Sequence, residues 1–251
     1  MAPTTISLIV FGFVFGGSLF GLYLGAVLPE KQLNAESRGL LKLGMGLMGT
    51  MTGLVLGLQL GSAVSAFDLQ QNDLTQISAK LILLNSALSH YGPETKSARE
   101  LLRKSAVQKL ELMWPKGIKK FGQWQPTSLE SDEMYYSIQA LSPTSEAQRA
   151  AKAQALSLLM DVGQTRWLMF EQQSSSASMP LMLVLATWLT VMFVSLGIFA
   201  PRTIMAITTL FVCATSVSCA IFLILELHSP LGGLIRIPSD PLRHAILYLG
   251  Q

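Results

Sequence analysis

The chain has 251 residues, of which 50% are hydrophobic and only 13% are charged. Its mean hydropathy is +0.45, whereas about a quarter of the residues in an ordinary soluble domain are charged. This composition excludes a typical soluble domain and indicates a protein that crosses the lipid bilayer. The net charge is only +3 and no long basic run is present, so we expect no nucleic-acid partner.

The first apolar segment covers residues 6–28 and contains no charged residue. At about 1.5 Å of rise per residue it can cross a hydrocarbon core of roughly 30 Å as a helix. It is also too long for the core of a signal peptide, so we expect a retained first transmembrane helix. Its small-xxx-small spacing favours close packing against the second membrane helix, and the glycines concerned are Gly12, Gly16, Gly17, Gly21 and Gly25.

A short charged link follows the first helix, beginning with Pro29. Its segment Glu36-Ser37-Arg38 has two interpretations, and the sequence leaves both open. The segment is either a solvated hairpin or, if several subunits surround an axis, a charged ring at a channel mouth. Glu36 and Arg38 are therefore candidate pore-mouth residues.

The second transmembrane helix is expected over residues 43–67, which contain no charge. Gly49, Gly53, Gly57 and Gly61 recur every fourth residue and form a stripe along this helix. Such a stripe lets another backbone approach closely, so we expect these glycines to be helix-packing residues. Packing between helices of one subunit is the simplest interpretation.

A second strip of the same helix contains polar side chains in the middle of the membrane. It consists of Thr52, Val55, Gln59 and Ser62. Polar groups within the bilayer usually face the interior of a helix bundle or a water-filled path. These four residues are therefore pore-lining candidates.

Helical periodicity continues beyond Asp68, where the chain becomes polar. Apolar residues alternate at intervals of three and four, which is the seam of a coiled coil or helical bundle: Leu74, Ile77, Leu81, Leu84, Leu88 and Tyr91. This pattern predicts that the second membrane helix continues out of the bilayer. Further amphipathic stretches follow, the last of them beginning with a Ser142 cap and Pro143. We therefore expect a helical extramembrane domain over residues 68–177.

Two more apolar segments predict a third transmembrane helix over residues 179–200 and a fourth over residues 203–226. Glu226 at the end of the fourth is expected to extend its carboxylate to the membrane surface, with a place on an ion path as the alternative. The tail, residues 227–251, is expected to pack on the helical domain. Four spans place both termini and the helical domain on one side, although charge does not decide which side.

No constellation of catalytic residues is present in the sequence. His90, His228 and His244 are scattered and lack the spacing of metal ligands. Nucleophile, phosphate-binding and paired-carboxylate motifs are also missing. We therefore expect no enzyme activity, no cofactor and no metal site.

Several strings distributed over nearly the whole chain resemble a bacterial membrane family of unknown function that is described as bestrophin-like. They include Leu28-Pro29-Glu30, Tyr91-Gly92-Pro93-Glu94, Gly163-Gln164-Thr165-Arg166-Trp167, Phe199-Ala200-Pro201-Arg202 and Gly233-Leu234-Ile235-Arg236-Ile237. More distantly, the order of helices is similar to that of true bestrophins. Those proteins are pentameric anion channels whose second membrane helix lines the pore neck and whose helical domain lies in the cytosol.

The resemblance implies a homo-oligomer, a pentamer by analogy, in the bacterial inner (plasma) membrane with the helical domain in the cytosol. It places the neck at about residues 48–62 and adds Met48 to the pore-lining candidates. Inorganic ions and the lipid bilayer would then be its partners. Bestrophin necks present bulky and aromatic side chains, whereas this helix has no aromatic residue before Phe67.

The sequence therefore predicts an all-α integral membrane protein with four transmembrane helices and a helical domain inserted between the second and the third. Its leading functional interpretation is an oligomeric ion channel whose central axis is lined by the second helix. The alternative is a non-conducting membrane scaffold or sensor whose helical domain binds a protein partner.

Overall fold

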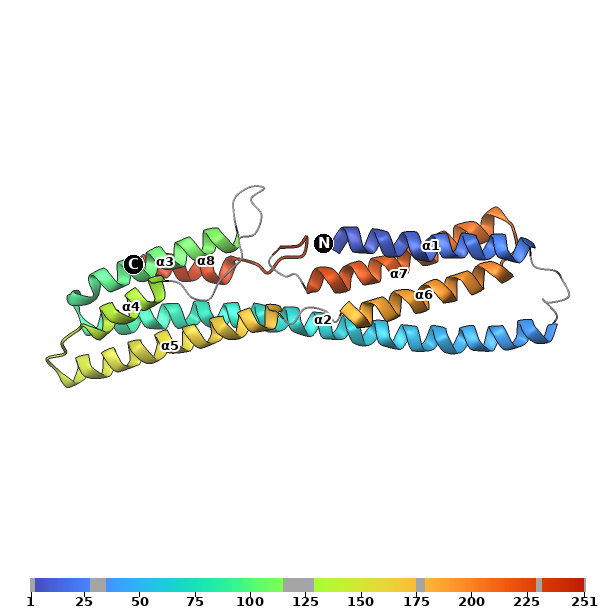
Figure 1. Cartoon of the computed structure of the whole chain (residues 1–251). Helices are drawn as coiled ribbons and strands as arrows, with labels where there is room; N and C mark the ends of the chain where they lie inside the picture. The colour runs from blue at the N-terminus through green and yellow to red at the C-terminus, as the bar shows by residue number, and fades with distance from the viewer. Residues whose placement is uncertain (1–2, 28–34, 115–128, 175–178, 229–231, 251) are drawn as a thin grey trace. The chain divides into compact units, whose positions relative to one another are not determined.

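The computed structural model describes residues 3–27, 35–114, 129–174, 179–228 and 232–250 (Figure 1). Every regular element within these ranges is helical, as the all-α prediction requires. The α-helices are α1 (Pro3–Val27), α2 (Ala35–Tyr91), α3 (Lys96–Met113), α4 (Leu129–Gln139), α5 (Glu146–Ser174), α6 (Met179–Phe199), α7 (Ile204–Leu227) and α8 (Asp240–Tyr248). A short 3₁₀ helix, η2 (Pro93–Thr95), precedes α3.

Among the described helices, α1, α2, α6 and α7 are long and apolar enough to cross a membrane. Helix α2 is by far the longest and runs without a break for 57 residues. Helix α7 has a capped start, because the hydroxyl of Thr203 accepts a hydrogen bond from the Ala206 amide at 3.3 Å.

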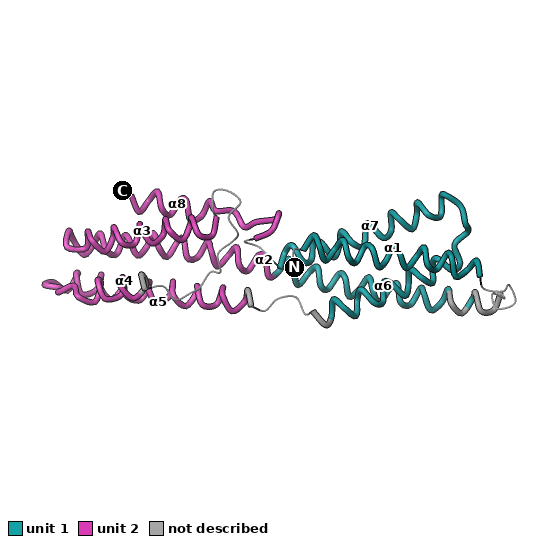
Figure 2. The backbone as a smooth tube through the Cα atoms, turned by 45° about the horizontal axis from the view of Figure 1, so that its top comes forward, with its two compact units in different colours: residues 1–65, 176–228 teal, residues 66–175, 229–251 magenta. Residues whose placement is uncertain are grey.

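The described chain divides into two compact units, which Figure 2 colours separately. Unit 1 comprises residues 1–65 and 176–228 and contains α1, α6, α7 and the first part of α2. In this unit α1 packs against both α6 and α7. Apolar residues at four- and seven-residue spacing form its core: Val10, Val14, Leu185, Leu189, Phe193, Leu210, Ala214 and Ile221.

Glycines bring the backbones of α1 and α6 unusually close together. A Cβ atom added to Gly25 would lie 2.5 Å from the carbonyl oxygen of Ile198. Cβ atoms added to Gly21 or Gly197 would meet backbone atoms of the facing helix at less than 3.0 Å. Gly17, Gly21 and Gly25 therefore serve contact with α6, whereas Gly12 and Gly16 meet no described atom, and the expectation that this spacing serves the second helix is wrong. Spacing along one helix marks a face for close approach but does not specify the partner.

Unit 2 comprises residues 66–175 and 229–251 and contains the rest of α2 together with α3, α4, α5 and α8. Within it α4 packs against α3 and α5, and α8 packs against α3 (Figure 1). The predicted seam after Asp68 is buried throughout, from Leu74 to Tyr91. The expected packing of the tail on the helical domain is also confirmed, because Leu242 and Leu249 share a core cluster with Leu84.

The turn between α2 and α3 depends on a glycine and a threonine. Gly92 has a φ of 132°, a conformation that side chains disfavour, so glycine suits the position directly after the last turn of α2. The hydroxyl of Thr95 is buried and donates to the carbonyl oxygens of Leu88 at 2.6 Å and Gly92 at 2.8 Å. These contacts reverse the chain tightly at the end of α2.

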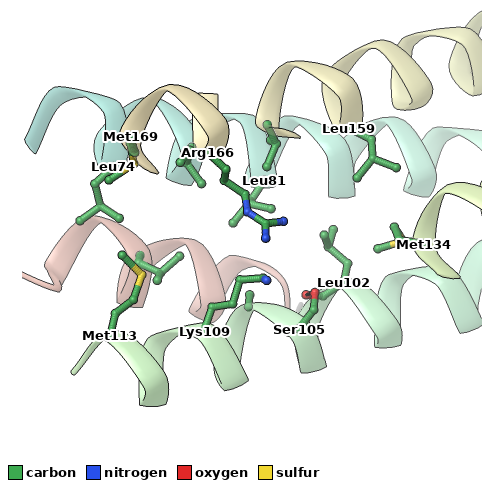
Figure 3. A pocket seen from close by; sticks show the side chains of 14 residues that line it. Leu74, Leu81, Leu102, Ser105, Lys109, Met113, Met134, Leu159, Arg166 and Met169 are labelled. Carbon is green, nitrogen blue, oxygen red and sulfur yellow. Dashed lines mark hydrogen bonds between the residues drawn. The ribbon is translucent and has the colours of Figure 1, made fainter. Parts of the chain in front are cut away.

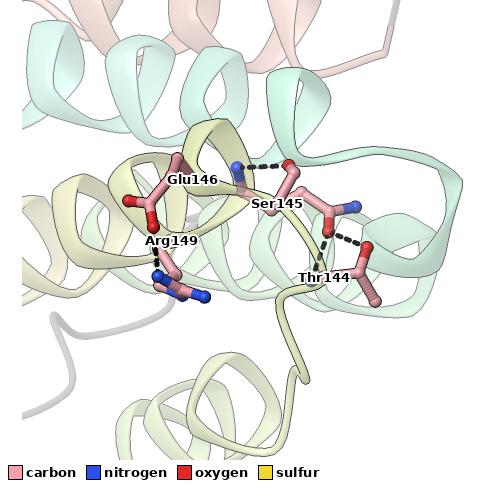
Figure 4. Close-up of polar contacts among 5 residues, drawn as sticks. Thr144, Ser145, Glu146 and Arg149 are labelled. Atoms are coloured by element: carbon pink, nitrogen blue, oxygen red, sulfur yellow. Dashed lines mark hydrogen bonds and ion pairs between the residues drawn. The ribbon is translucent and has the colours of Figure 1, made fainter.

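Helix α5 begins at Glu146, not at Ser142 as the sequence suggested. The cap is Ser145, whose hydroxyl accepts a hydrogen bond from the Gln148 amide at 3.2 Å (Figure 4). The Gln148 side chain in turn accepts from the Thr144 amide at 2.8 Å. The helix therefore starts where Ser145 and Gln148, three residues apart, can each accept a hydrogen bond from a backbone amide at the helix end. Ser142 and Pro143 lie outside the helix.

Candidate functional site

Helix α2 is the least covered of the four candidate membrane helices. Between Leu43 and Ser65 only Thr52 and Ala63 are buried by the described residues. Val55 and Leu56 lie on the same side and pack against the core of unit 1. One narrow side of α2, the covered face, therefore contacts its own chain, and the opposite side, the uncovered face, does not.

The five pore-lining candidates fall on different sides of this helix. Thr52 is only 3% exposed, and no described group forms a hydrogen bond with its hydroxyl. Val55 packs on the core, Met48 and Gln59 are half-buried, and Ser62 is exposed. In a single chain four of the candidates therefore lie on or beside the covered face, and Ser62, at the edge of the same strip, is the one that its own chain leaves exposed.

Apart from Gly61, the uncovered face contains residues that are not among the site candidates predicted from the sequence. Their spacing of three and four residues keeps them together on the helix, and all are exposed: Leu47, Thr50, Leu54, Leu58, Gly61 and Ser65. The face is apolar at one end and small or polar towards Ser65. The spacing of these residues can be seen in the sequence. Only the packing of unit 1 shows that they lie opposite the covered face.

The glycine stripe of α2 also lies largely in open space. Among the described residues, no heavy atom lies within 4 Å of a Cβ added to Gly53, Gly57 or Gly61, whereas a Cβ added to Gly49 would lie 3.8 Å from the sulfur of Met192. The simplest interpretation, packing against another helix of the same subunit, is therefore wrong for these three glycines. Their role as packing residues becomes a proposal about a second chain.

The pore-mouth candidates Glu36 and Arg38 belong to the first turns of α2. Their side chains lie outside the described part of the structure, so their role stays a prediction. At the end of α7, Glu226 is only 2% exposed, so its expected extension to the membrane surface is wrong.

Unit 2 contains a cavity of about 70 Å³ between α2, α3, α4, α5 and α8 (Figure 3). Its lining is apolar apart from Ser105 and Lys109 on α3 and Arg166 on α5, whose polar ends lie towards the cavity in Figure 3. None of the described side chains that line it is acidic. The cavity was not predicted, because its walls come from segments far apart in the sequence.

Asp73 is a buried carboxyl group in unit 2, beyond the apolar part of α2. Its side chain is 8% exposed, and its Oδ2 atom lacks a hydrogen-bond partner among the described residues. Burial raises the pKa of Asp73 above the ordinary value of 3.8, while the hydrogen bond with Gln172 and the charge of Lys80 act in the opposite direction. The ionised carboxylate is therefore less stable in the folded protein than in water.

Asp73→Asn should accordingly stabilise the protein at neutral pH. Because the folded-state pKa is raised, wild-type stability falls as the pH rises from 3.8 through that raised pKa, whereas the asparagine variant does not titrate there. Thermal midpoints of detergent-solubilised protein between pH 4 and pH 8 should differ most at pH 8. Asp161→Asn, at an exposed site on α5, is the control and should show no such trend. A difference that is independent of pH would refute the assignment.

Comparison with known proteins agrees with the resemblance to the bestrophin-like family that the sequence motifs indicated. The family model described as Bestrophin-like domain matches residues 12–242, which include parts of both compact units. No curated protein and no solved structure matches the chain. The match covers most of the sequence and every candidate membrane helix except the first residues of α1. The chain therefore belongs to the Bestrophin-like domain family.

Proposed function

We propose that the protein is an oligomeric ion channel in which several copies of α2 surround a central axis and form the ion path. Membership of the Bestrophin-like family supports an ion-channel kind of function. The observation that carries the proposal is the exposure of α2, whose apolar segment is left almost bare by its own chain.

Exposure to lipid alone does not require a partner, because lipid tails are as apolar as leucine side chains. Glycine, however, lowers helix stability by about 1 kcal/mol relative to alanine, and it offers lipid little contact surface. Gly53, Gly57 and Gly61 have open space beside them, which suits close approach by a helix of a neighbouring copy. We therefore assign these glycines to contacts between subunits.

The rest of the uncovered face would then line the ion path, with Gly61 at its edge in the contact between subunits. Leu47, Leu54 and Leu58 would form an apolar constriction that can close by dewetting, and Ser62 would lie beside it. Met48, Thr52, Val55 and Gln59 would brace the path from the covered face. Glu36 and Arg38 would lie at its mouth.

In this proposal the four apolar helices span a bacterial inner membrane and unit 2 lies in the cytosol. Both placements come from the family resemblance, as does the number of five subunits. No cofactor is needed, because conduction requires only a constriction and a suitable lining.

Cysteine substitution at two adjacent positions tests which face of α2 meets the ions. Leu54 lies on the uncovered face and Val55 packs on the core of unit 1. In bilayer recordings, a bulky water-soluble thiol reagent should abolish most of the current through Leu54→Cys and leave Val55→Cys unchanged. The native cysteines Cys213 and Cys219, both exposed, would first be replaced by serine.

The cysteine-free background is the control, and it should conduct and ignore the reagent. If the reagent blocks only the current through Val55→Cys, the covered face lines the ion path. That result would overturn the proposed lining. Silent bilayers containing correctly assembled oligomers would overturn the channel itself and favour the non-conducting scaffold.

A further inference from the structure

Between Leu43 and Ser89, where the structure describes every side chain of α2, the uncovered face contains one charged residue, Asp68. Continuing from Ser65 in steps of three and four residues, this face passes through exposed positions only: Asp68, Asn72, Thr75, Ala79, Leu83, Ser86 and His90. Helix α2 is unbroken over all of them. Between Asp68 and the terminal His90 these side chains are uncharged, and all except Leu83 are small or polar.

The other charged residues of this stretch point elsewhere. Between Leu43 and Ser89 the sequence contains only two besides Asp68, namely Asp73 and Lys80. Asp73 is buried, and Lys80 is half-buried and donates from Nζ to the hydroxyl of Thr165 at 3.2 Å. Over these residues the uncovered face therefore has one negative charge and no positive charge.

We propose that the ions conducted are cations and that Asp68 selects them. This inference rests on the proposed function, because it requires copies of α2 around a common axis. Symmetry would repeat Asp68 once per subunit and so place a ring of carboxylates at one level of the path. Acidic rings favour cations, and a confined path with apolar walls strengthens their field.

The charge pattern opposes anion conduction, which the resemblance to true bestrophins would suggest. An anion passing Asp68 would meet a like charge that no cation on the same face of α2 offsets between Leu43 and Ser89. Hydroxyl and amide oxygens on either side, from Ser65 and Asn72, can instead replace part of the hydration shell of a cation.

Reversal potentials across bilayers with a KCl gradient test the inference. The wild type should prefer K⁺ to Cl⁻. Asp68→Asn should lower the permeability ratio of K⁺ to Cl⁻ by about tenfold, Asp68→Glu should retain it, and Asp68→Lys should favour Cl⁻. Raising the salt concentration should weaken the preference of the wild type, because exposed charges are screened.

Glu133→Gln is the matched control, because it removes an acidic charge from an exposed position on α4. Its permeability ratio should equal that of the wild type. The inference would be overturned if the wild type conducts but prefers Cl⁻, or if Asp68→Asn leaves the permeability ratio unchanged. Either result would still agree with the proposed channel function. Absence of current from assembled wild-type protein would overturn the proposed function instead.

Discussion

Replacing Gly21 by alanine is expected to separate α1 from α6 and destabilise the membrane unit. The added Cβ atom would lie within 3.0 Å of the Val194 carbonyl group and 3.1 Å from the Cα atom of Gly197. These are backbone atoms, so no rotamer change can make room and the helices must move apart. Overpacking typically costs 1–3 kcal/mol, and we expect about 3 kcal/mol here. The thermal midpoint and the monodisperse fraction in detergent should both fall.

Gly16→Ala is the control on the same helix. No heavy atom of the described chain lies within 4 Å of its added Cβ atom, so alanine should be neutral or slightly stabilising through its higher helix propensity. Equal stability of Gly16→Ala and Gly21→Ala would show that α1 and α6 are not in the close contact described.

Leu84→Ala should produce a comparable loss in unit 2. Leu84 is 0% exposed and belongs to the core cluster that joins α2 with α3, α4, α5 and α8. Truncation of a fully buried leucine removes its transfer free energy and leaves a cavity, at a cost of about 2–5 kcal/mol. We expect a lower thermal midpoint of the full-length protein in detergent, with earlier proteolysis of unit 2.

The adjacent residue is a matched control, because Leu83 is 52% exposed on the same helix. Leu83→Ala should change the free energy of unfolding by no more than about 0.5 kcal/mol. A larger effect at Leu83 than at Leu84 would mean that α2 presents the opposite face to the core, and it would also overturn the assignment of Asp68 to the uncovered face.

Local features of the sequence predicted most of the helices. The apolar segment predicted at residues 179–200 corresponds to α6, Met179–Phe199, because length and hydropathy alone identify such a helix. The spacing of the apolar residues from Leu74 to Tyr91 likewise predicted a buried seam, and these residues are buried. The start of α5 was misplaced because two serines compete as caps and only the hydrogen bonds of Ser145 and Gln148 decide between them.

The candidate site was less predictable. The sequence showed the polar strip on the second helix, but four of the five pore-lining candidates lie on or beside the face that unit 1 covers. Polarity within the bilayer indicates that a side chain avoids lipid, and a bundle interior satisfies this as well as a water-filled path does. Polarity alone therefore could not separate Ser62 from Thr52.

By itself, the sequence determined that this protein is helical, that four of its segments can cross a membrane and that it resembles the bestrophin-like family. Those properties depend on composition and short-range periodicity, which each segment carries alone. Only the tertiary structure decided that α1 packs on α6 through Gly21 and Gly197, and that α2 leaves Gly57 and Asp68 uncovered. A glycine stripe or a polar strip defines a face of a helix, but the partner of that face depends on side chains contributed by distant parts of the chain.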